Sequence, residues 1–326
     1  MRKHLARRSK ANDLWGFALA FLAFTVSACA TFPDISQSRS PCRMEPGGWC
    51  AFVRDAAVDA YPYAIAATNT YIGDDDLFGN IGPNLVPIER RELDEEDKGT
   101  GFDYRIFQQF KSGSKGDPDR KPIARILAFR GTDFDGLTDI FYGTLRNDQI
   151  DLALKYFELE MARFEGETEQ ELPWVVTGHS LGGALATEVS AKYPAVRAYM
   201  FNTSPFYNAE SMQNDMYRTV FNERGELLRR FSKYSAPPAA DVFTLNCAPQ
   251  KGTFTKHKIR PLADCITWIA AYADKDAKAI VDANKLKKPM VECGPDDKVH
   301  PGTNPPYIEP CVHQARRAKS ENGNSD

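Results

Sequence analysis

The sequence lacks the spacings and long apolar runs that several classes of protein require. Its seven cysteines and five histidines form neither a C-x-x-C nor an H-x-x-x-H pattern, which disfavours a bound metal. Beyond residue 26 no apolar run approaches about 18 residues, the length of a membrane-spanning helix. We therefore expect no metal and no spanning helix after the N-terminal region.

The N-terminal region has the pattern of an export signal. Basic residues between Arg2 and Lys10 precede an apolar run at 14–26, which is too short for a stable anchor and fits a signal-peptide core. The run ends in Val26-Ser27-Ala28-Cys29, which resembles the lipobox of bacterial lipoproteins, where the cysteine becomes N-terminal and lipidated. An ordinary secretory signal is the alternative. Because residue 30 is alanine rather than aspartate, we expect lipid anchoring to the outer membrane of a bacterial cell envelope.

Charge and composition divide the chain into four parts. Removing residues 1–28 takes five basic residues and one acidic residue from totals of 41 and 44, which leaves 36 and 43 and a net charge near −7. This balance excludes nucleic acid and anionic membrane surfaces as expected partners. We expect a signal peptide at 1–28, a lipidated tether at 29–50, a folded domain at 51–286 and a Pro/Gly-rich tail at 287–326.

The cysteines agree with export into an oxidising compartment. Six remain once Cys29 is assigned to the lipid, and an even number is typical of a disulfide framework. Six cysteines allow 15 pairings, and the sequence does not choose among them. Proximity in the chain favours Cys42 with Cys50, Cys247 with Cys265, and Cys293 with Cys311.

Apolar periodicity predicts an α/β domain. An amphipathic helix at 147–164 and a second helix at 180–192 separate short strands at 123–129, 174–177 and 198–202. Short connections of this kind imply right-handed crossovers and a largely parallel sheet. Further elements are expected as a helical stripe at 51–71 interrupted by Pro62, antiparallel strands at 85–90 and 104–110, strands at 217–221 and 241–246, and a helix at 261–273.

The sequence around Ser180 has the G-x-S-x-G pattern of a nucleophile elbow. Gly178-His179-Ser180-Leu181-Gly182 lies between an apolar strand and a helix, where a sharp turn exposes the serine hydroxyl. The N–H of Leu181 would then face the reacting carbonyl at the start of a helix. We predict Ser180 as nucleophile and Leu181 as one oxyanion donor.

A base and an acid are expected after the nucleophile in the chain. Of the histidines at 257, 300 and 313, we favour His257 because it precedes a helix that can pack on the sheet. For the acid, the position after the predicted strand at 217–221 favours Glu223 and Glu226, with Asp241 as the main rival, and of these we favour Glu226. His179 receives no role, since a residue adjacent to the nucleophile points its side chain away.

The second oxyanion donor is expected in the loop after the strand at 123–129. Arg130-Gly131-Thr132-Asp133 occupies that place, and Thr132 offers both an N–H and a hydroxyl. An ordinary glycine turn is the alternative.

The two segments 128–133 and 176–186, separated by an amphipathic helix, resemble the class 3 (fungal-type) lipase family. The resemblance covers roughly residues 100–275 and implies an α/β-hydrolase fold, a mostly parallel central sheet with helices on both faces. It also implies a cofactor-free enzyme that cleaves lipid and other carboxylic esters. The family keeps a catalytic aspartate where this chain has Gly225-Glu226, which is a departure. Residues 134–146 take the place near which the family carries a lid, although a plain packed loop is equally expected.

The sequence therefore predicts a membrane-tethered serine esterase or lipase. The rival hypothesis is a catalytically silent envelope lipoprotein that uses the same scaffold to bind a lipid or a partner protein. Acyl transfer or peptide-bond hydrolysis by the same residues is a third reading, because a fold hosts many reactions.

Overall fold

The computed structural model describes residues 42, 45–71, 77–114, 116–117, 119–131, 144–166, 171–205, 215–230, 239–289 and 291–292. Cys29, Thr132, Cys293 and Cys311 lie outside these residues, and so do 132–143 of the expected oxyanion loop and cover. Within the described ranges, no helix has both the length and the apolarity needed to cross a bilayer.

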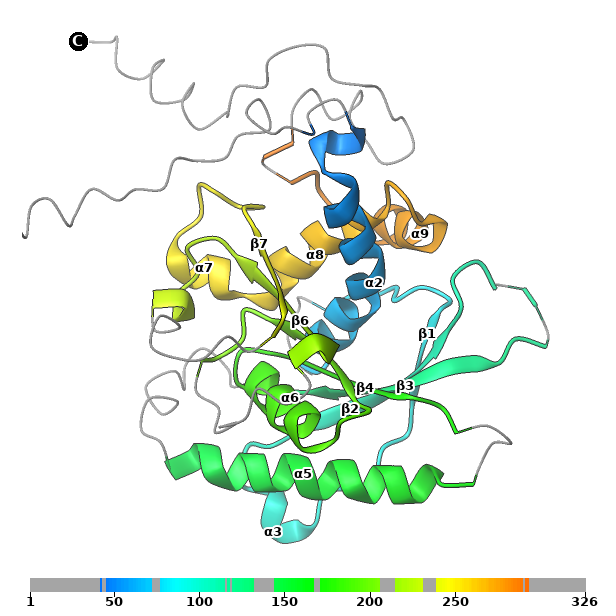
Figure 1. The fold of residues 1–326 in the computed structure, drawn as a ribbon, viewed down its shortest axis with the longest axis vertical. Coiled ribbons are helices and arrows are strands. Elements are labelled where there is room, and N and C mark those ends of the chain that lie inside the picture. The colour runs from blue at the N-terminus through cyan, green and yellow to red at the C-terminus, as the bar shows by residue number, and fades with distance from the viewer. Residues whose placement is uncertain are drawn as a thin grey trace, which may run out of the picture. The chain divides into compact units, whose positions relative to one another are not determined.

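A seven-stranded mixed sheet forms the centre of the fold (Figure 1). The strands follow one another in chain order, and β1, β2 and β3 pair antiparallel, whereas β3 to β7 pair parallel. The parallel strands therefore end at one common edge, where the candidate site lies. The strands are β1 (Leu85–Ile88), β2 (Tyr104–Phe110), β3 (Pro122–Phe129), β4 (Trp174–His179), β5 (Arg197–Phe201), β6 (Arg218–Glu223) and β7 (Asp241–Leu245).

Helices occupy both faces of this sheet because the strand residues alternate between two cores. Ile126 and Val175 belong to the core shared with α2, α8 and α9, whereas their neighbours Leu127 and Val176 belong to the core shared with α5 and α6. The expected fold class, an α/β-hydrolase arrangement with helices on both faces, is confirmed. The helices are α2 (Ala51–Thr68), α3 (Glu95–Lys98), α5 (Thr144–Phe164), α6 (Leu181–Lys192), α7 (Thr253–His257), α8 (Ile259–Ala270) and α9 (Lys275–Asn284).

Pro62 does not interrupt the helix that contains it. α2 runs through Pro62 to Thr68, and its residues from Ala60 to Thr68 are buried. The helix packs against α8 and the strand β4, and this burial outweighs the loss of one backbone hydrogen bond at the proline. The sequence analysis does not predict α9, and it predicts the end of α8 at residue 273, three residues after the observed end at Ala270.

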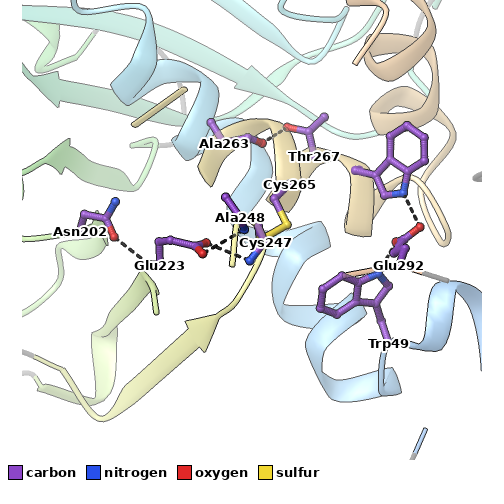
Figure 2. The surroundings of a disulfide bond; sticks show 10 residues. Trp49, Asn202, Glu223, Cys247, Ala248, Ala263, Cys265, Thr267 and Glu292 are labelled. Carbon is purple, nitrogen blue, oxygen red and sulfur yellow. Dashed lines mark hydrogen bonds between the residues drawn. A yellow bond between two sulfur atoms is a disulfide. The ribbon is translucent and has the colours of Figure 1, made fainter. Parts of the chain in front are cut away.

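Two of the three expected disulfides are present. Cys42 joins Cys50 and Cys247 joins Cys265, and the third pair lies outside the described residues. Figure 2 shows the second bridge between the end of β7 and α8. Because α7 lies between its two cysteines, this disulfide closes a loop around His257.

The segment expected as a separate tail begins with packed residues. Val291 and Glu292 are buried, and Glu292 accepts hydrogen bonds from Trp49 Nε1 (Figure 2), from Trp268 Nε1 at 3.0 Å and from the Tyr272 hydroxyl at 3.0 Å. Burial raises the pKa of the Glu292 carboxyl to about 7. Residues 291–292 thus pack against α8 and the residues that precede α2.

Candidate active site

The turn between β4 and α6 places Ser180 in a strained conformation. Its φ is +56° and its ψ is −121°, a region that residues with a side chain rarely adopt. A Cβ atom on Gly178 would overlap the backbone of Gly182, and one on Gly182 would overlap the Phe129 carbonyl. The glycines are therefore required by the close approach of β3, β4 and α6, as the elbow pattern predicts.

The imidazole of His257 lies between Ser180 and Glu226. Its Nε2 is 3.0 Å from Ser180 Oγ, and its Nδ1 is 2.7 Å from Glu226 Oε2. All three side chains are buried, each at about one per cent exposure. The structure thus brings together the three residues favoured from the sequence. His257 is the last residue of the short helix α7, which the sequence did not predict and which ends four residues before the helix predicted at 261–273.

The carboxylate of Glu226 is fixed by two further donors. Oε2 also accepts from the Leu228 N–H at 2.8 Å, and Oε1 accepts from the Arg229 N–H at 2.5 Å. Gly225 precedes it with a φ of +76°, which turns the chain back after β6. Because the carboxylate already accepts two N–H groups, we assign the shared hydrogen to His257 Nδ1, so that Nε2 faces Ser180 as an acceptor.

The two rival carboxylates differ from Glu226 in their partners or in their position. Glu223, the last residue of β6, accepts from the Cys247 N–H at 3.0 Å and the Ala248 N–H at 3.1 Å (Figure 2). Burial raises its pKa to about 7, although these two N–H groups favour the charged form. Asp241 begins β7 and pairs with Thr219, four residues and about 13 Å before the end of β6. Neither carboxylate is paired with His257 in the structure.

His179 and Asn202, to which the sequence assigned no role, contact the backbone of His257. His179 Nε2 lies 2.6 Å from the His257 carbonyl oxygen, and its Nδ1 lies 2.8 Å from the Tyr71 hydroxyl. The Asn202 amide donates to the same carbonyl at 3.0 Å. The histidine inside the elbow, His179, was the one feature of the sequence that could have indicated these contacts, because a buried imidazole needs polar partners.

Of the two expected oxyanion donors, Leu181 is among the described residues. Leu181 is the first residue of α6, so its N–H is one of the initial N–H groups that no helical carbonyl accepts. Thr132 lies outside the described residues, but its neighbour Gly131 is packed so closely that a Cβ would overlap the Tyr71 hydroxyl and the His179 carbonyl. The residue before Thr132 therefore lies against the residue before Ser180.

Among the described residues, no group of three or more histidine, cysteine, aspartate or glutamate side chains is arranged to hold a metal ion. Of the groups in the site, His179 has a shifted pKa. Burial, and then electrostatic interaction with the His257 ring, lowers the pKa of His179 well below its ordinary value. The His179 ring is therefore neutral at neutral pH.

No family model matches the chain, and no curated protein matches it. Several solved structures are similar to part of it, among them the following three. Lipase II from Rhizopus niveus is 13% identical with a TM-score of 0.36, over 53% of this chain and 74% of that one. A Rhizomucor miehei lipase in a propeptide complex is 14% identical with a TM-score of 0.34, over 55% and 62%. A mutant form of MDLA from Penicillium cyclopium is 18% identical with a TM-score of 0.31, over 58% and 76%.

Proposed function

We propose that the protein is a serine hydrolase that cleaves carboxylic esters through Ser180, His257 and Glu226. The observation that supports this function is the continuous hydrogen-bonded path from Ser180 Oγ through the imidazole to a carboxylate held by two backbone N–H groups. Such a path gives each group a role: nucleophile, base and orienting acid. A purely structural serine needs no strained elbow to present its hydroxyl.

In the proposed reaction Ser180 Oγ attacks the ester carbonyl carbon while His257 Nε2 takes the hydroxyl proton. The tetrahedral intermediate collapses to an acyl-serine, and the leaving alkoxide takes that proton from His257. Water then attacks the acyl-serine while His257 takes a proton from the water, and His257 passes that proton to Ser180 Oγ as the carboxylic acid leaves, which restores the serine. Glu226 stabilises the imidazolium, and the N–H groups of Leu181 and Thr132 bind the oxyanion, each at about 3 kcal/mol.

We extend the proposal to lipid esters and to a lipid anchor on Cys29 at the bacterial envelope. The support for the anchor is the sequence at 26–29, and the support for lipid substrates is the apolar composition of residues 134–142. The substrate would then lie in the same membrane that holds the enzyme. Metabolic labelling with a palmitate analogue, compared between wild type and Cys29→Ser, tests the anchor separately from the chemistry.

The central experiment is covalent labelling with an alkyl phosphonate, followed by peptide mapping. We expect one adduct on Ser180, none in Ser180→Ala, and loss of p-nitrophenyl ester hydrolysis in that variant. A profile over acyl chains of increasing length then separates an esterase from a lipase. Folded protein that hydrolyses neither short nor long esters and forms no Ser180 adduct would refute the proposal and favour the silent lipoprotein.

A further inference from the structure

The backbone of His257 lies at a helix end that needs outside partners. α7 has five residues and ends at His257, and Lys258 then adopts an extended conformation with φ −57° and ψ 138°. No N–H group within such a helix donates to its last carbonyl oxygens, so groups from outside the helix must donate to them. Two side chains do so here, one at the end of β4 and one directly after β5.

The His257 carbonyl oxygen accepts hydrogen bonds from His179 Nε2 at 2.6 Å and from Asn202 Nδ2 at 3.0 Å. Asn202 Nδ2 also lies 3.0 Å from the preceding carbonyl, that of Lys256. His179 ends β4 and is directly bonded to Ser180, and Asn202 directly follows β5. The base is therefore attached through its own backbone to the strands that carry and flank the nucleophile.

The geometry fixes the tautomer of His179. A carbonyl oxygen only accepts, so Nε2 must carry the hydrogen, and Nδ1 of the neutral ring then accepts from the Tyr71 hydroxyl at 2.8 Å. The ring is 4% exposed, and its centroid lies 4.9 Å from that of His257. Tyr71 thus orients the ring, and the ring donates to His257.

Asn202 is held at both ends of its side chain. Its Oδ1 accepts from the Glu223 N–H at 2.8 Å (Figure 2), while its Nδ2 donates to the α7 carbonyls. Its φ is +42°, a left-handed conformation that asparagine tolerates better than most residues. The residue is completely buried. Its amide therefore joins the end of β6, which leads to Glu226, to the end of α7.

We propose that His179 and Asn202 are positioning residues, which set the distance between Ser180 Oγ and His257 Nε2 by holding the His257 carbonyl oxygen. This inference rests on the proposed function, because it concerns the same serine and base. Proton transfer requires the two atoms within hydrogen-bond reach. A displacement of about 1 Å in such a pair costs roughly 100-fold in rate.

The test compares variants that keep or remove each donor. His179→Leu removes the donor, whereas His179→Gln offers an amide N–H near the place of Nε2. We expect kcat to fall about 10- to 100-fold in His179→Leu with KM little changed, and less than tenfold in His179→Gln. Asn202→Gly removes the amide but accepts the positive φ, and Asn202→Asp puts an oxygen against two carbonyls. We expect a loss in Asn202→Gly and a larger one in Asn202→Asp.

Thr267→Val is the matched control. Thr267 is fully buried and donates to the Ala263 carbonyl at 2.8 Å within α8, so its replacement also removes a buried side-chain donor to a carbonyl (Figure 2). We expect an unchanged kcat in this variant. Thermal unfolding of every variant checks that differences in kcat do not follow from loss of fold.

NMR of the ¹⁵N-labelled imidazoles gives a readout that needs no turnover. The signal of the hydrogen between His257 Nδ1 and Glu226 should move in His179→Leu and return toward its wild-type position in His179→Gln. An unmoved signal with a wild-type kcat in His179→Leu and Asn202→Gly would overturn the inference. Failure of the wild type to label at Ser180 would instead refute the proposed function, while the NMR comparison would still decide whether His179 positions His257.

Discussion

The end of β6 and the turn after it carry two glutamates that are alike in burial and different in partners. Glu223 is 2% exposed and Glu226 is 1% exposed. Glu223 accepts from the backbone N–H groups of Cys247 and Ala248, whereas Glu226 accepts from an imidazole as well as from two N–H groups. Burial and position after a strand therefore do not identify the acid of the site. The partner does, because only Glu226 faces a group that gains a proton in the proposed reaction.

The two glutamates have different roles at this edge of the sheet. Glu226 orients the side chain of His257, while Glu223 holds the first residues of the segment that leads to it. That segment runs from Cys247 to Cys265 and contains α7. Changes at Glu226 should therefore alter chemistry, and changes around Glu223 should alter stability first.

Glu226→Gln should produce the largest effect. The amide N–H₂ would face the N–H of Leu228 in one orientation and that of Arg229 in the other, so neither orientation keeps both hydrogen bonds and the side chain would lose its orientation toward His257. We expect kcat to fall on the order of 1,000- to 10,000-fold with little change in KM. Steady-state kinetics with a p-nitrophenyl ester measures it. A Glu226→Gln enzyme within tenfold of wild type would remove Glu226 from the proposed triad.

Opening the disulfide beside Glu223 should come next. Replacing Cys247 and Cys265 together with serine releases a loop with a sequence separation of 18, which costs about 3 kcal/mol of unfolding free energy. Because His257 lies inside that loop, kcat should fall as well. The double serine variant of Cys42 and Cys50 opens a bridge that does not enclose His257, and it should retain kcat. Equal kinetic losses in both variants would contradict a local effect on the base.

The raised pKa of Glu223 predicts a pH-dependent stability. Between the ordinary glutamate pKa of about 4.3 and the folded value of about 7, the folded chain binds a proton that the unfolded chain has lost. The contribution is therefore complete below about pH 4 and disappears as the pH rises through 7. Urea unfolding at pH 5, 6 and 7 should show stability falling by about 2 kcal/mol from this group, with a shallower fall in Glu223→Gln.

Glu292 provides the comparison for that experiment. Its folded pKa is also raised to about 7, so Glu292→Gln should flatten the same pH window. The two variants should differ in their kinetics, because Glu223 holds the His257 segment and Glu292 holds Trp49, Trp268 and Tyr272. Identical slopes in wild type and both variants would show that neither carboxyl takes up a proton on folding.

The smallest expected effect is that of Gly225→Ala. Gly225 has a φ of +76° with only Lys256 Nζ nearby, so an added Cβ meets strain rather than a clash. We expect a loss of about 1 kcal/mol in unfolding free energy. Gly252→Ala is the control, because Gly252 has an ordinary φ of −67° and open space around it. Urea denaturation of the two variants gives the difference in unfolding free energy that comes from the left-handed conformation just before Glu226.

Local patterns predicted most of the sheet and the elbow. The strands from 104 to 129 and from 174 to 201 have apolar runs flanked by turn residues, and the glycines around Ser180 reveal a close backbone approach. The predicted interruption at Pro62 was wrong, because the tertiary packing of α2 outweighs the local unfavourable effect of a proline on a helix. The helix α7 was missed because five residues carry too little periodicity to recognise.

The site could be predicted only where chain order constrains it. The order of serine, acid and base narrowed the choice to a few residues, and Glu226 was favoured over Glu223 without a physical reason to separate them. The contacts of His179 and Asn202 with the His257 carbonyl join strands to a segment more than 50 residues away. No local pattern encodes such a contact, because both donors serve a backbone atom rather than a recognisable side chain.

The hydrogen bonds of Glu292 have a topological consequence. Because this residue contacts Trp49, 243 positions earlier, the first and last packed parts of the described fold meet beside α8. A short linker between them would make a circular permutant, with new ends opened at the exposed turn around Gly116. That turn joins β2 to β3 at the edge of the sheet opposite Ser180, so the reordered chain would leave the elbow, His257 and Glu226 on uncut segments.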